Sequence, residues 1–305
     1  MNVTLLHNPA SGDGHPSGAF LIDRFESAGH RVIYRSIAEP GWADAIEPTA
    51  ELIVAAGGDG TARRVVLALA GLVRASEVPL ALIPIGTANN IARSLELHDG
   101  IDGLVHGLHG ARRTRLAVGV ARGGWGESRF VESAGVGLVA ALLRRSELEE
   151  DENDKDPKAT RVQAGIDRLR RELTSTEPRH LRIDADGVDL SGDYLLVEAM
   201  NIASIGPGVA LAPDADQADD WLDLVLAGEG DRETLDDYLH ARRDGTDRPM
   251  PIPVRRVRKL RMTWPPDDGH LDDTVWPESV ASLARPDGTV AIEIDHAIPI
   301  LIPSC

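Results

Sequence analysis

Glycines and one acid stand directly after an apolar run, in the order Gly57-Gly58-Asp59-Gly60-Thr61. Glycines allow backbone N–H groups to approach a phosphate closely, because no Cβ stands in the way. Residues 52–56 before them have the composition of a buried strand, and a helix-compatible segment begins near Thr61. The positive end of such a helix adds attraction for an anion. The stretch predicts a phosphate-binding loop in which Asp59 holds a metal ion or a counter-charge. Its simpler interpretation is a tight turn with an N-capping Asp or Thr.

Two further turns follow strand-like runs elsewhere in the first third of the chain. One is Asn8-Pro9-Ala10-Ser11-Gly12, and the other is Gly86-Thr87-Ala88-Asn89-Asn90. Strand-like and helix-like segments alternate here, which predicts a mainly parallel sheet covered on both faces. Such a sheet places the loops that follow its strands along one edge, so we expect the three turns to converge on one cleft.

The elements that must position these turns follow from hydrophobic periodicity and turn residues. Strands are predicted at residues 3–7, 31–35, 52–56 and 79–84, with helices at residues 20–29, 43–50 and 62–73. Residues 138–175 read as helix, interrupted by the acidic run 147–154, which we interpret as a solvated loop. From residue 181 onward, short β-prone runs separated by Gly, Pro and Asp predict an antiparallel sandwich with one helix at residues 233–243. The predicted fold class is therefore an α/β, Rossmann-like N-terminal domain followed by a mostly antiparallel β-sandwich domain.

Composition excludes several classes of function. The chain has 305 residues and a formal net charge of -17, which argues against nucleic-acid binding and against a general attraction to anionic membranes. The single cysteine, Cys305, permits no intrachain disulfide, and no signal peptide or membrane span is apparent, so we expect a cytoplasmic protein. There is no P-loop and no zinc motif of the common types. Gly135-Val136-Gly137-Leu138-Val139-Ala140 fits a loose dinucleotide-binding pattern, with strand-to-helix packing as the alternative.

Taken together, the three turns, in this order and after comparable strands, resemble the diacylglycerol-kinase catalytic-domain family in its soluble bacterial branch. Sphingosine and ceramide kinases are relatives of that family, and NAD kinase is a more distant one. The resemblance implies a nucleotide domain at residues 1–115, to which the final strand at 296–305 returns, and a β-sandwich acceptor domain at 116–295. It implies an ATP-dependent lipid kinase, a phosphotransferase with an alcohol group as acceptor, in which ATP and the lipid meet between the domains.

The same resemblance assigns nucleotide-binding roles to residues of all three turns. Phosphoryl transfer asks mainly for positioned phosphates and neutralised charge, which backbone N–H groups and Mg²⁺ supply. A hydroxyl after the second strand is often a further nucleotide contact in the family, and Ser36 stands at that place. The implied set is Asn8, Ser36, Gly57, Gly58, Asp59, Gly60, Thr61, Ala62, Arg63, Gly86, Thr87 and Asn89.

The resemblance extends in part to the second half of the chain. The run Asp219-Asp220-Trp221-Leu222-Asp223 is similar to a family segment that holds a structural Mg²⁺, which implies Asp216, Asp219 and Trp221 as ligands. The catalytic base of the family lies in a late Asp-Gly-Glu motif, which corresponds to Asp272-Asp273-Thr274, so Asp272 is the candidate base. A competing alignment selects Asp295. The implied cofactors are ATP and Mg²⁺.

Two alternatives remain beside the lipid kinase. The altered Asp-Gly-Glu motif suggests a nucleotide-binding protein of the same fold without catalysis. The acidic composition suggests a kinase for a soluble acceptor on the NAD-kinase pattern. The sequence also leaves open which lipid is the acceptor, diacylglycerol-like or sphingoid-like, whether the protein touches a membrane transiently, and whether it forms a homodimer.

Overall fold

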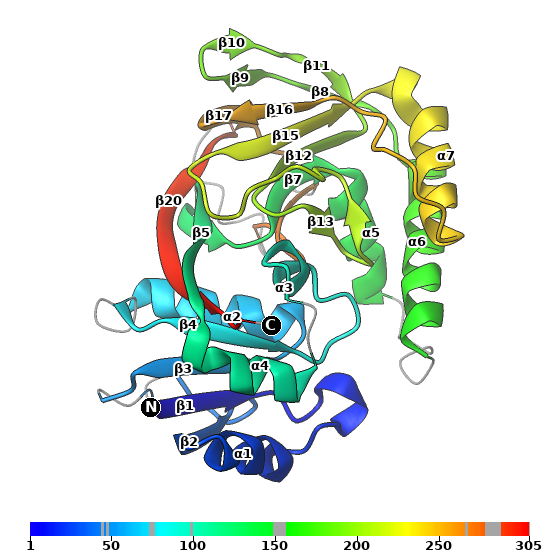
Figure 1. The fold of residues 1–305 in the computed structure, drawn as a ribbon. Helices are drawn as coiled ribbons and strands as arrows, with labels where there is room; N and C mark the ends of the chain where they lie inside the picture. The colour runs from blue at the N-terminus through cyan, green and yellow to red at the C-terminus, as the bar shows by residue number, and fades with distance from the viewer. Residues whose placement is uncertain are drawn as a thin grey trace. The chain divides into compact units, whose positions relative to one another are not determined.

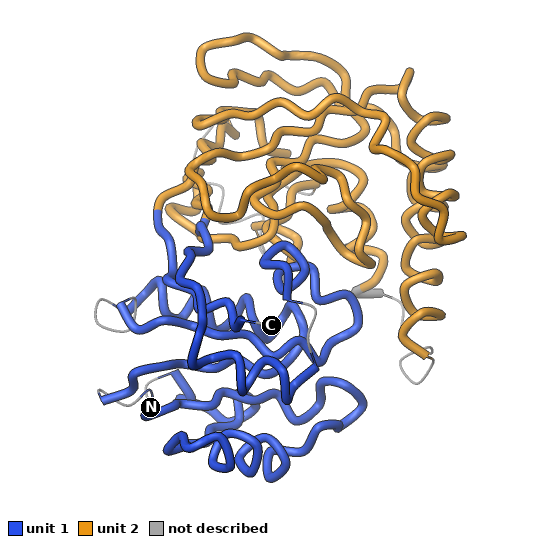
Figure 2. The backbone as a smooth tube through the Cα atoms, viewed as in Figure 1, with its two compact units in different colours: residues 1–118, 296–305 blue, residues 119–295 orange. Residues whose placement is uncertain are grey.

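The computed structural model describes residues 1–43, 46, 49–72, 77–97, 100–148, 157–265, 268–277 and 288–304. The chain forms two compact units, one of residues 1–118 with 296–305 and the other of residues 119–295 (Figures 1 and 2). Two strands run through the boundary between the units in the sequence, β5 (Arg112–Gly123) and β20 (Thr289–Ile302). None of the helices in the described parts of the chain has the length and apolar composition of a membrane span.

The first unit is built on a parallel sheet with the strand order β2-β1-β3-β4-β20. Its central strand β3 is buried along its whole length, because a parallel strand between two helical layers has no solvated face. The strands are β1 (Asn2–His7), β2 (Arg31–Ser36), β3 (Leu52–Gly57) and β4 (Leu80–Pro84). The helices are α1 (Gly18–Ser27), α2 (Asp59–Gly71), α3 (Asn90–Ser94) and α4 (Ile101–Gly107), with the 3-10 turns η1 (Ser11–Gly14) and η3 (Leu108–Gly110).

The second unit is an antiparallel sandwich. One sheet has the order β16-β15-β12-β7-β18-β19, and the other contains β10, β9, β17 and the first part of β20. Apolar side chains of both sheets, among them Val197, Leu224, Leu260 and Ile292, form one buried cluster between them. The strands are β6 (Gly126–Phe130), β7 (Ser133–Gly137), β8 (Arg179–Leu181), β9 (Ile183–Ala185), β10 (Val188–Asp189), β11 (Gly192–Tyr194), β12 (Leu196–Met200), β13 (Ser204–Ile205), β14 (Val209–Ala210), β15 (Leu222–Ala227), β16 (Val254–Val257), β17 (Lys259–Thr263), β18 (Gly269–Leu271) and β19 (Thr274–Val275).

Helices cover the outer face of the β16–β19 sheet. They are α5 (Leu138–Leu148), α6 (Lys158–Ser175) and α7 (Arg232–Arg243), preceded by η4 (Glu229–Asp231). A second apolar cluster joins them to this sheet, with Leu169 and Leu239 packed against Met200 and Val225.

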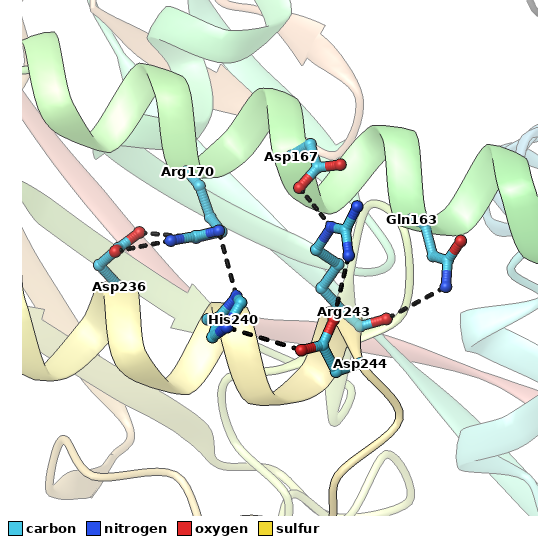
Figure 3. Close-up of polar contacts among 7 residues, drawn as sticks. All are labelled: Gln163, Asp167, Arg170, Asp236, His240, Arg243 and Asp244. Atoms are coloured by element: carbon cyan, nitrogen blue, oxygen red, sulfur yellow. Dashed lines mark hydrogen bonds and ion pairs between the residues drawn. The ribbon is translucent and has the colours of Figure 1, made fainter.

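Reciprocal ion pairs hold α6 and α7 side by side (Figure 3). Arg170 of α6 donates to both carboxylate oxygens of Asp236 at 2.8 and 2.9 Å, and these bonds lower the pKa of Asp236. Arg243 of α7 donates back to Asp167 of α6 at 2.7 Å. Exposed pairs of this kind contribute little to stability, so they set the register of the two helices while the apolar cluster beneath supplies most of the free energy.

The predicted fold class is confirmed, both for the mainly parallel α/β unit and for the antiparallel sandwich. The helix predicted at residues 62–73 begins three residues earlier, at Asp59, so Asp59 and Gly60 belong to its first turn. The predicted helix at 43–50 and the acidic run at 147–154 lie largely outside the described residues.

Candidate functional site

The three predicted turns lie at the carboxyl ends of neighbouring strands in the first unit. In the register of the sheet, His7 of β1 stands opposite Ala56 of β3, and Gly57 of β3 stands opposite Pro84 of β4. The loops that follow these strands therefore leave the same edge of the sheet, as the alternation of strands and helices predicts.

Two glycines lie against each other where the second loop, residues 57–61, meets the third loop, residues 86–90. A Cβ built on Gly58 would lie 3.1 Å from the Cα of Gly86, and a Cβ on Gly86 would collide with the Cα of Gly58. The N–H of Ile85 donates to the carbonyl of Gly57 at 3.0 Å. Glycine is required at position 86, where a Cβ would meet backbone, and a Cβ at position 58 would be crowded; neither residue has a positive φ.

The first loop contacts both of the others. The side chain of Asn8 donates to the hydroxyl of Thr61 at 3.3 Å, and its backbone N–H donates to the carbonyl of Ala56 at 3.0 Å. A Cβ on Gly12, whose φ is 65°, would lie 2.9 Å from the carbonyl oxygen of Ile85. The structure thus brings residues of all three predicted turns together.

The amino end of α2 lies within this group of loops. The N–H groups of Thr61 and Ala62 both donate to the carbonyl of Gly58. In an α-helix the first N–H groups have no carbonyl one turn earlier to bond, and in α2 these belong to Gly58, Asp59 and Gly60. With the positive end of the helix dipole, they form the kind of site that binds phosphate oxygens.

The Asp59 carboxylate bonds to the backbone at the start of the next helix. Its carboxylate accepts the N–H of Ile91 at 3.0 Å and also bonds to the backbone N–H groups of Asn89 and Asn90, so it caps the start of α3. Burial raises the pKa of Asp59, while these amide bonds and the charge of Arg93 act in the opposite direction. Asp59 therefore links the second loop to the third, as an N-capping residue would.

Asn89 and Ser36 hold the neighbouring backbone. Asn89 has a left-handed conformation with φ 53°, and its side chain both accepts from the N–H of Gly86 at 2.9 Å and donates to the carbonyl of Gly86 at 3.0 Å. Ser36 ends β2 opposite His7, and its hydroxyl accepts the N–H of Ala38 at 3.2 Å. Ala62 is buried inside α2, so its side chain packs in the core of the unit.

In the second unit, the candidate base Asp272 lies in the turn between β18 and β19. Its carboxylate accepts the backbone N–H groups of Val131 at 3.0 Å, Glu132 at 2.6 Å and Ser133 at 3.3 Å. The residue has a left-handed φ of 53° and is 9% exposed. These bonds hold the Asp272 carboxylate in one orientation, facing the backbone of residues 131–133.

The competing candidate, Asp295, has a different environment. One of its oxygens accepts from Arg122 at 3.0 Å, and the other lies 3.4 Å from Arg129. Glu127 and Glu293 join the same network of partly exposed charges. Asp295 is thus paired with two guanidinium groups, whereas the Asp272 carboxylate is bonded by neutral backbone amides.

The loop predicted to hold a structural magnesium ion is closed by its own hydrogen bonds. The Asp219 carboxylate accepts the N–H of Trp221 at 2.8 Å and pairs with Arg256. The carbonyl of Asp216 accepts the N–H of Asp219 at 3.1 Å. No group of three or more acidic, His or Cys side chains with metal-binding geometry occurs among the described residues. A metal ion at Asp219 would have to displace a guanidinium, so this arrangement does not fit a resident Mg²⁺, and the ligand set remains a prediction.

Removing Arg256 tests whether it takes the place of a cation. In the Arg256→Ala variant the Asp219 carboxylate loses its positive partner, so we expect Mg²⁺ to raise the melting temperature of the variant but not of the parent chain. The measurement is thermal unfolding in excess MgCl₂ against EDTA. Arg258→Ala is the matched control, because the guanidinium of Arg258 stacks on the ring of the neighbouring Trp221, with its Cζ 4.5 Å from the ring centroid. A large Mg²⁺-dependent shift in the parent chain would contradict this interpretation.

Sequence reasoning missed the groups that hold Asp272. They are backbone N–H groups of residues 131–133, which carry no residue signature. Asn201 holds the same segment: its side chain donates to the carbonyl of Val131 at 2.7 Å, and its backbone N–H donates to the carbonyl of Glu132 at 2.9 Å. The Gly135-Val136-Gly137 pattern lies in β7 and its exit to α5, which is strand-to-helix packing.

Comparisons with known proteins agree with this architecture. A family model described as the diacylglycerol kinase catalytic domain matches residues 2–121, and one described as the YegS C-terminal NAD kinase beta sandwich-like domain matches residues 152–275. The chain is 26% identical over 251 residues to a diacylglycerol kinase of Mycobacterium tuberculosis, with 76% of this chain and 75% of the relative covered. It is 29% identical over 231 residues to a diacylglycerol kinase of Bacillus subtilis, with 73% and 72% covered.

A solved structure has the same fold. The crystal structure of a diacylglycerol kinase from Bacillus anthracis str. Sterne superposes with a TM-score of 0.66 at 18% identity, over 98% of this chain and 96% of that one. At this identity the likeness concerns the fold alone. The two family models, which follow one another along the chain, carry the assignment further: the protein belongs to the diacylglycerol-kinase catalytic-domain family.

Proposed function

We propose that the protein is an ATP-dependent lipid kinase that transfers the γ-phosphate of ATP to the hydroxyl of a diacylglycerol-like or sphingoid-like lipid. The observation that supports this most is the meeting of three glycine-bearing loops beside the amino end of α2 in the first unit. Such an arrangement supplies N–H donors and helix dipole to phosphates, which is most of what phosphoryl transfer needs from a protein.

In this proposal the nucleotide lies against the loops of the first unit. The N–H groups of residues 58–60 bind phosphate oxygens, and the Asn8–Thr61 contact and the Asn89 side chain keep the loops in place. Mg²⁺ enters with ATP as its counter-ion and neutralises charge on the phosphates. Thr87 and Arg63 are further members of the proposed nucleotide site.

The second unit has one role in the transfer step. The lipid hydroxyl oxygen forms a bond to the γ-phosphorus, the bond from that phosphorus to the β–γ bridging oxygen breaks, and ADP leaves. The proton of the hydroxyl passes to the Asp272 carboxylate, whose oxygens are held by the amides of residues 131–133. In kinases of this kind the acid orients the hydroxyl as well as accepting its proton.

The test is phosphate transfer from γ-labelled ATP with Mg²⁺ to lipids in mixed micelles. The panel contains diacylglycerol, a sphingoid base and ceramide, with NAD⁺ as a soluble acceptor in a parallel reaction. We expect labelled phospholipid from at least one lipid and no labelled dinucleotide. Transfer to NAD⁺ alone, or bound ATP that is never consumed, would contradict the proposal and favour one of the alternatives named above.

A further inference from the structure

A buried ion pair lies on the same sheet as Asp272 and takes no part in the proposed transfer. Nε2 of His270 in β18 lies 2.8 Å from Oε1 of Glu198 in β12, and both side chains are fully buried. Oε2 of Glu198 has no hydrogen-bond partner among the described residues. Burying two charges is costly, and such a pair often adds less stability than apolar side chains of the same volume would. Its presence therefore calls for a purpose beyond packing.

A glycine on the strand between them lets the two side chains meet. Strand β7 separates β12 from β18, and Gly135 stands opposite both Glu198 and His270 in the register of the sheet. A Cβ at Gly135 would collide with the Glu198 carboxylate. The missing side chain opens a slot across the middle strand, through which Glu198 reaches the imidazole two strands away. This explains one glycine of the dinucleotide-like pattern.

The other nitrogen of the ring reaches the candidate base. Nδ1 of His270 lies 2.9 Å from the backbone carbonyl oxygen of Asp272. Both ring nitrogens face oxygen acceptors, and an imidazole donates from both nitrogens only when it is protonated. Burial alone would lower the pKa of His270, but the charge and hydrogen bond of Glu198 and the Asp272 carbonyl outweigh it and raise the pKa.

Asp272 needs support of this kind because its conformation is unfavourable. A left-handed φ is uncommon for residues other than glycine, and here it turns the side chain back onto residues 131–133. Three parts of the residue are held: its carboxylate by those amides, its N–H by the carbonyl of Ser133 at 2.8 Å, and its carbonyl by His270. The histidine bond comes from outside the residue 131–133 segment.

We propose that Glu198 and His270 are positioning residues that fix the Asp272 peptide through the imidazole, so that the Asp272 carboxylate stays aimed for proton acceptance. The inference rests on the proposed function, because it assumes that Asp272 accepts the proton of the acceptor hydroxyl. It assigns a function to a glycine, an acid and a histidine that sequence reasoning left without one.

The pH dependence of stability follows from the same pair. The titratable groups that face His270 are Glu198 from β12 and Asp272 from its own hairpin. The pKa of His270 is higher in the folded protein than in the unfolded chain. The pair therefore stabilises the fold fully below the ordinary histidine pKa of about 6.5, and this stabilisation is lost as pH rises through the raised pKa of the folded protein. As pH rises over that range, we expect the melting temperature of the wild type to fall relative to that of His270→Asn, because the asparagine side chain does not titrate.

Two substitutions at His270 separate the two bonds of the ring. The amide nitrogen of asparagine stands near the place of Nδ1, so His270→Asn keeps a donor for the Asp272 carbonyl and leaves Glu198 unpaired. The amide of glutamine stands near the place of Nε2, so His270→Gln keeps the bond to Glu198 and loses the one to Asp272. Both variants are assayed for kcat, for KM of ATP and for melting temperature. The backbone amide signals of residues 131–133 are followed by NMR as a readout that does not depend on activity.

A positioning role predicts that stability and activity separate between the two variants. We expect His270→Asn to melt lower, because it leaves a buried charge unpaired, yet to keep kcat within about threefold of the wild type. We expect His270→Gln to lose kcat by about tenfold or more at unchanged KM for ATP, with shifted amide signals at residues 131–133. Losses of kcat that simply follow melting temperature, or amide signals unchanged in His270→Gln, would overturn the inference. A wild type that transfers no phosphate would instead refute the proposed function.

Discussion

Replacing Asp272 with asparagine is expected to lower kcat for phosphate transfer by about two to four orders of magnitude, the usual contribution of a general base. Asparagine tolerates the left-handed conformation of Asp272, and its amide oxygen can still accept the N–H groups of Glu132 and Ser133. The fold should therefore survive while the proton acceptor is lost. ATP binding should stay within about twofold of the parent, because Asp272 takes no part in the loops of the first unit.

The control for this substitution is Asp273→Asn in the same turn. Asp273 is exposed, and its carboxylate accepts from the hydroxyl of Thr274 at 3.2 Å. The Asp273→Asn variant loses the same charge one residue further along the chain, so we expect nearly parental kcat. Equal losses in both variants would mean that the charge of the turn matters rather than a base at Asp272. Full activity of Asp272→Asn would show that Asp272 is not the base and would make Asp295 the candidate.

The second large effect is expected from Gly86→Ala. The added methyl group would enter the contact between the second and third loops, where it meets the Cα of Gly58 and lies 2.8 Å from Oδ1 of Asn89. One of these neighbours is backbone, so the loops must separate. Overpacking of this kind costs about 1–3 kcal/mol of stability. We expect the affinity for MgATP, measured by isothermal titration, to fall at least about tenfold, or about 1.4 kcal/mol.

Gly71→Ala is the matched control for this change. Gly71 ends α2, and a Cβ at that position meets no atom within 4 Å. Alanine is favoured over glycine in a helix, so the control should bind MgATP normally and melt no lower than the parent. If Gly86→Ala binds MgATP as tightly as Gly71→Ala does, the contact of the two loops has no bearing on the nucleotide.

Much of the first unit could be predicted because its signals are local. An apolar strand, a glycine turn and a helix follow one another within about fifteen residues around Gly57, and a parallel sheet leaves little freedom in where the loops go. The convergence of Asn8, Gly58 and Gly86 follows from that rule. The task of Asp59 could not be predicted in the same way, since its partner Ile91 is 32 residues away and is reached through the fold.

The environment of Asp272 was beyond sequence reasoning for the same physical reason. Its carboxylate bonds to amides about 140 residues earlier in the chain, and amides have no side-chain signature. The Glu198–His270 pair spans 72 residues and a strand between them. The alternation of side chains along a strand would place His270 and Asp272 on the same side of it. The position of Gly135 between His270 and Glu198 follows only from the register of the sheet.

The most direct test of the account is amide hydrogen exchange with and without MgATP, read at single-residue resolution. Bound phosphate would occupy the N–H groups at the start of α2 and restrain the loops around them, which slows their exchange. We expect slower exchange at residues 8–12, 57–61 and 86–90 together, and the loss of that protection in Gly86→Ala. Unchanged exchange in all three loops at saturating MgATP, or slower exchange confined to other segments, would contradict it.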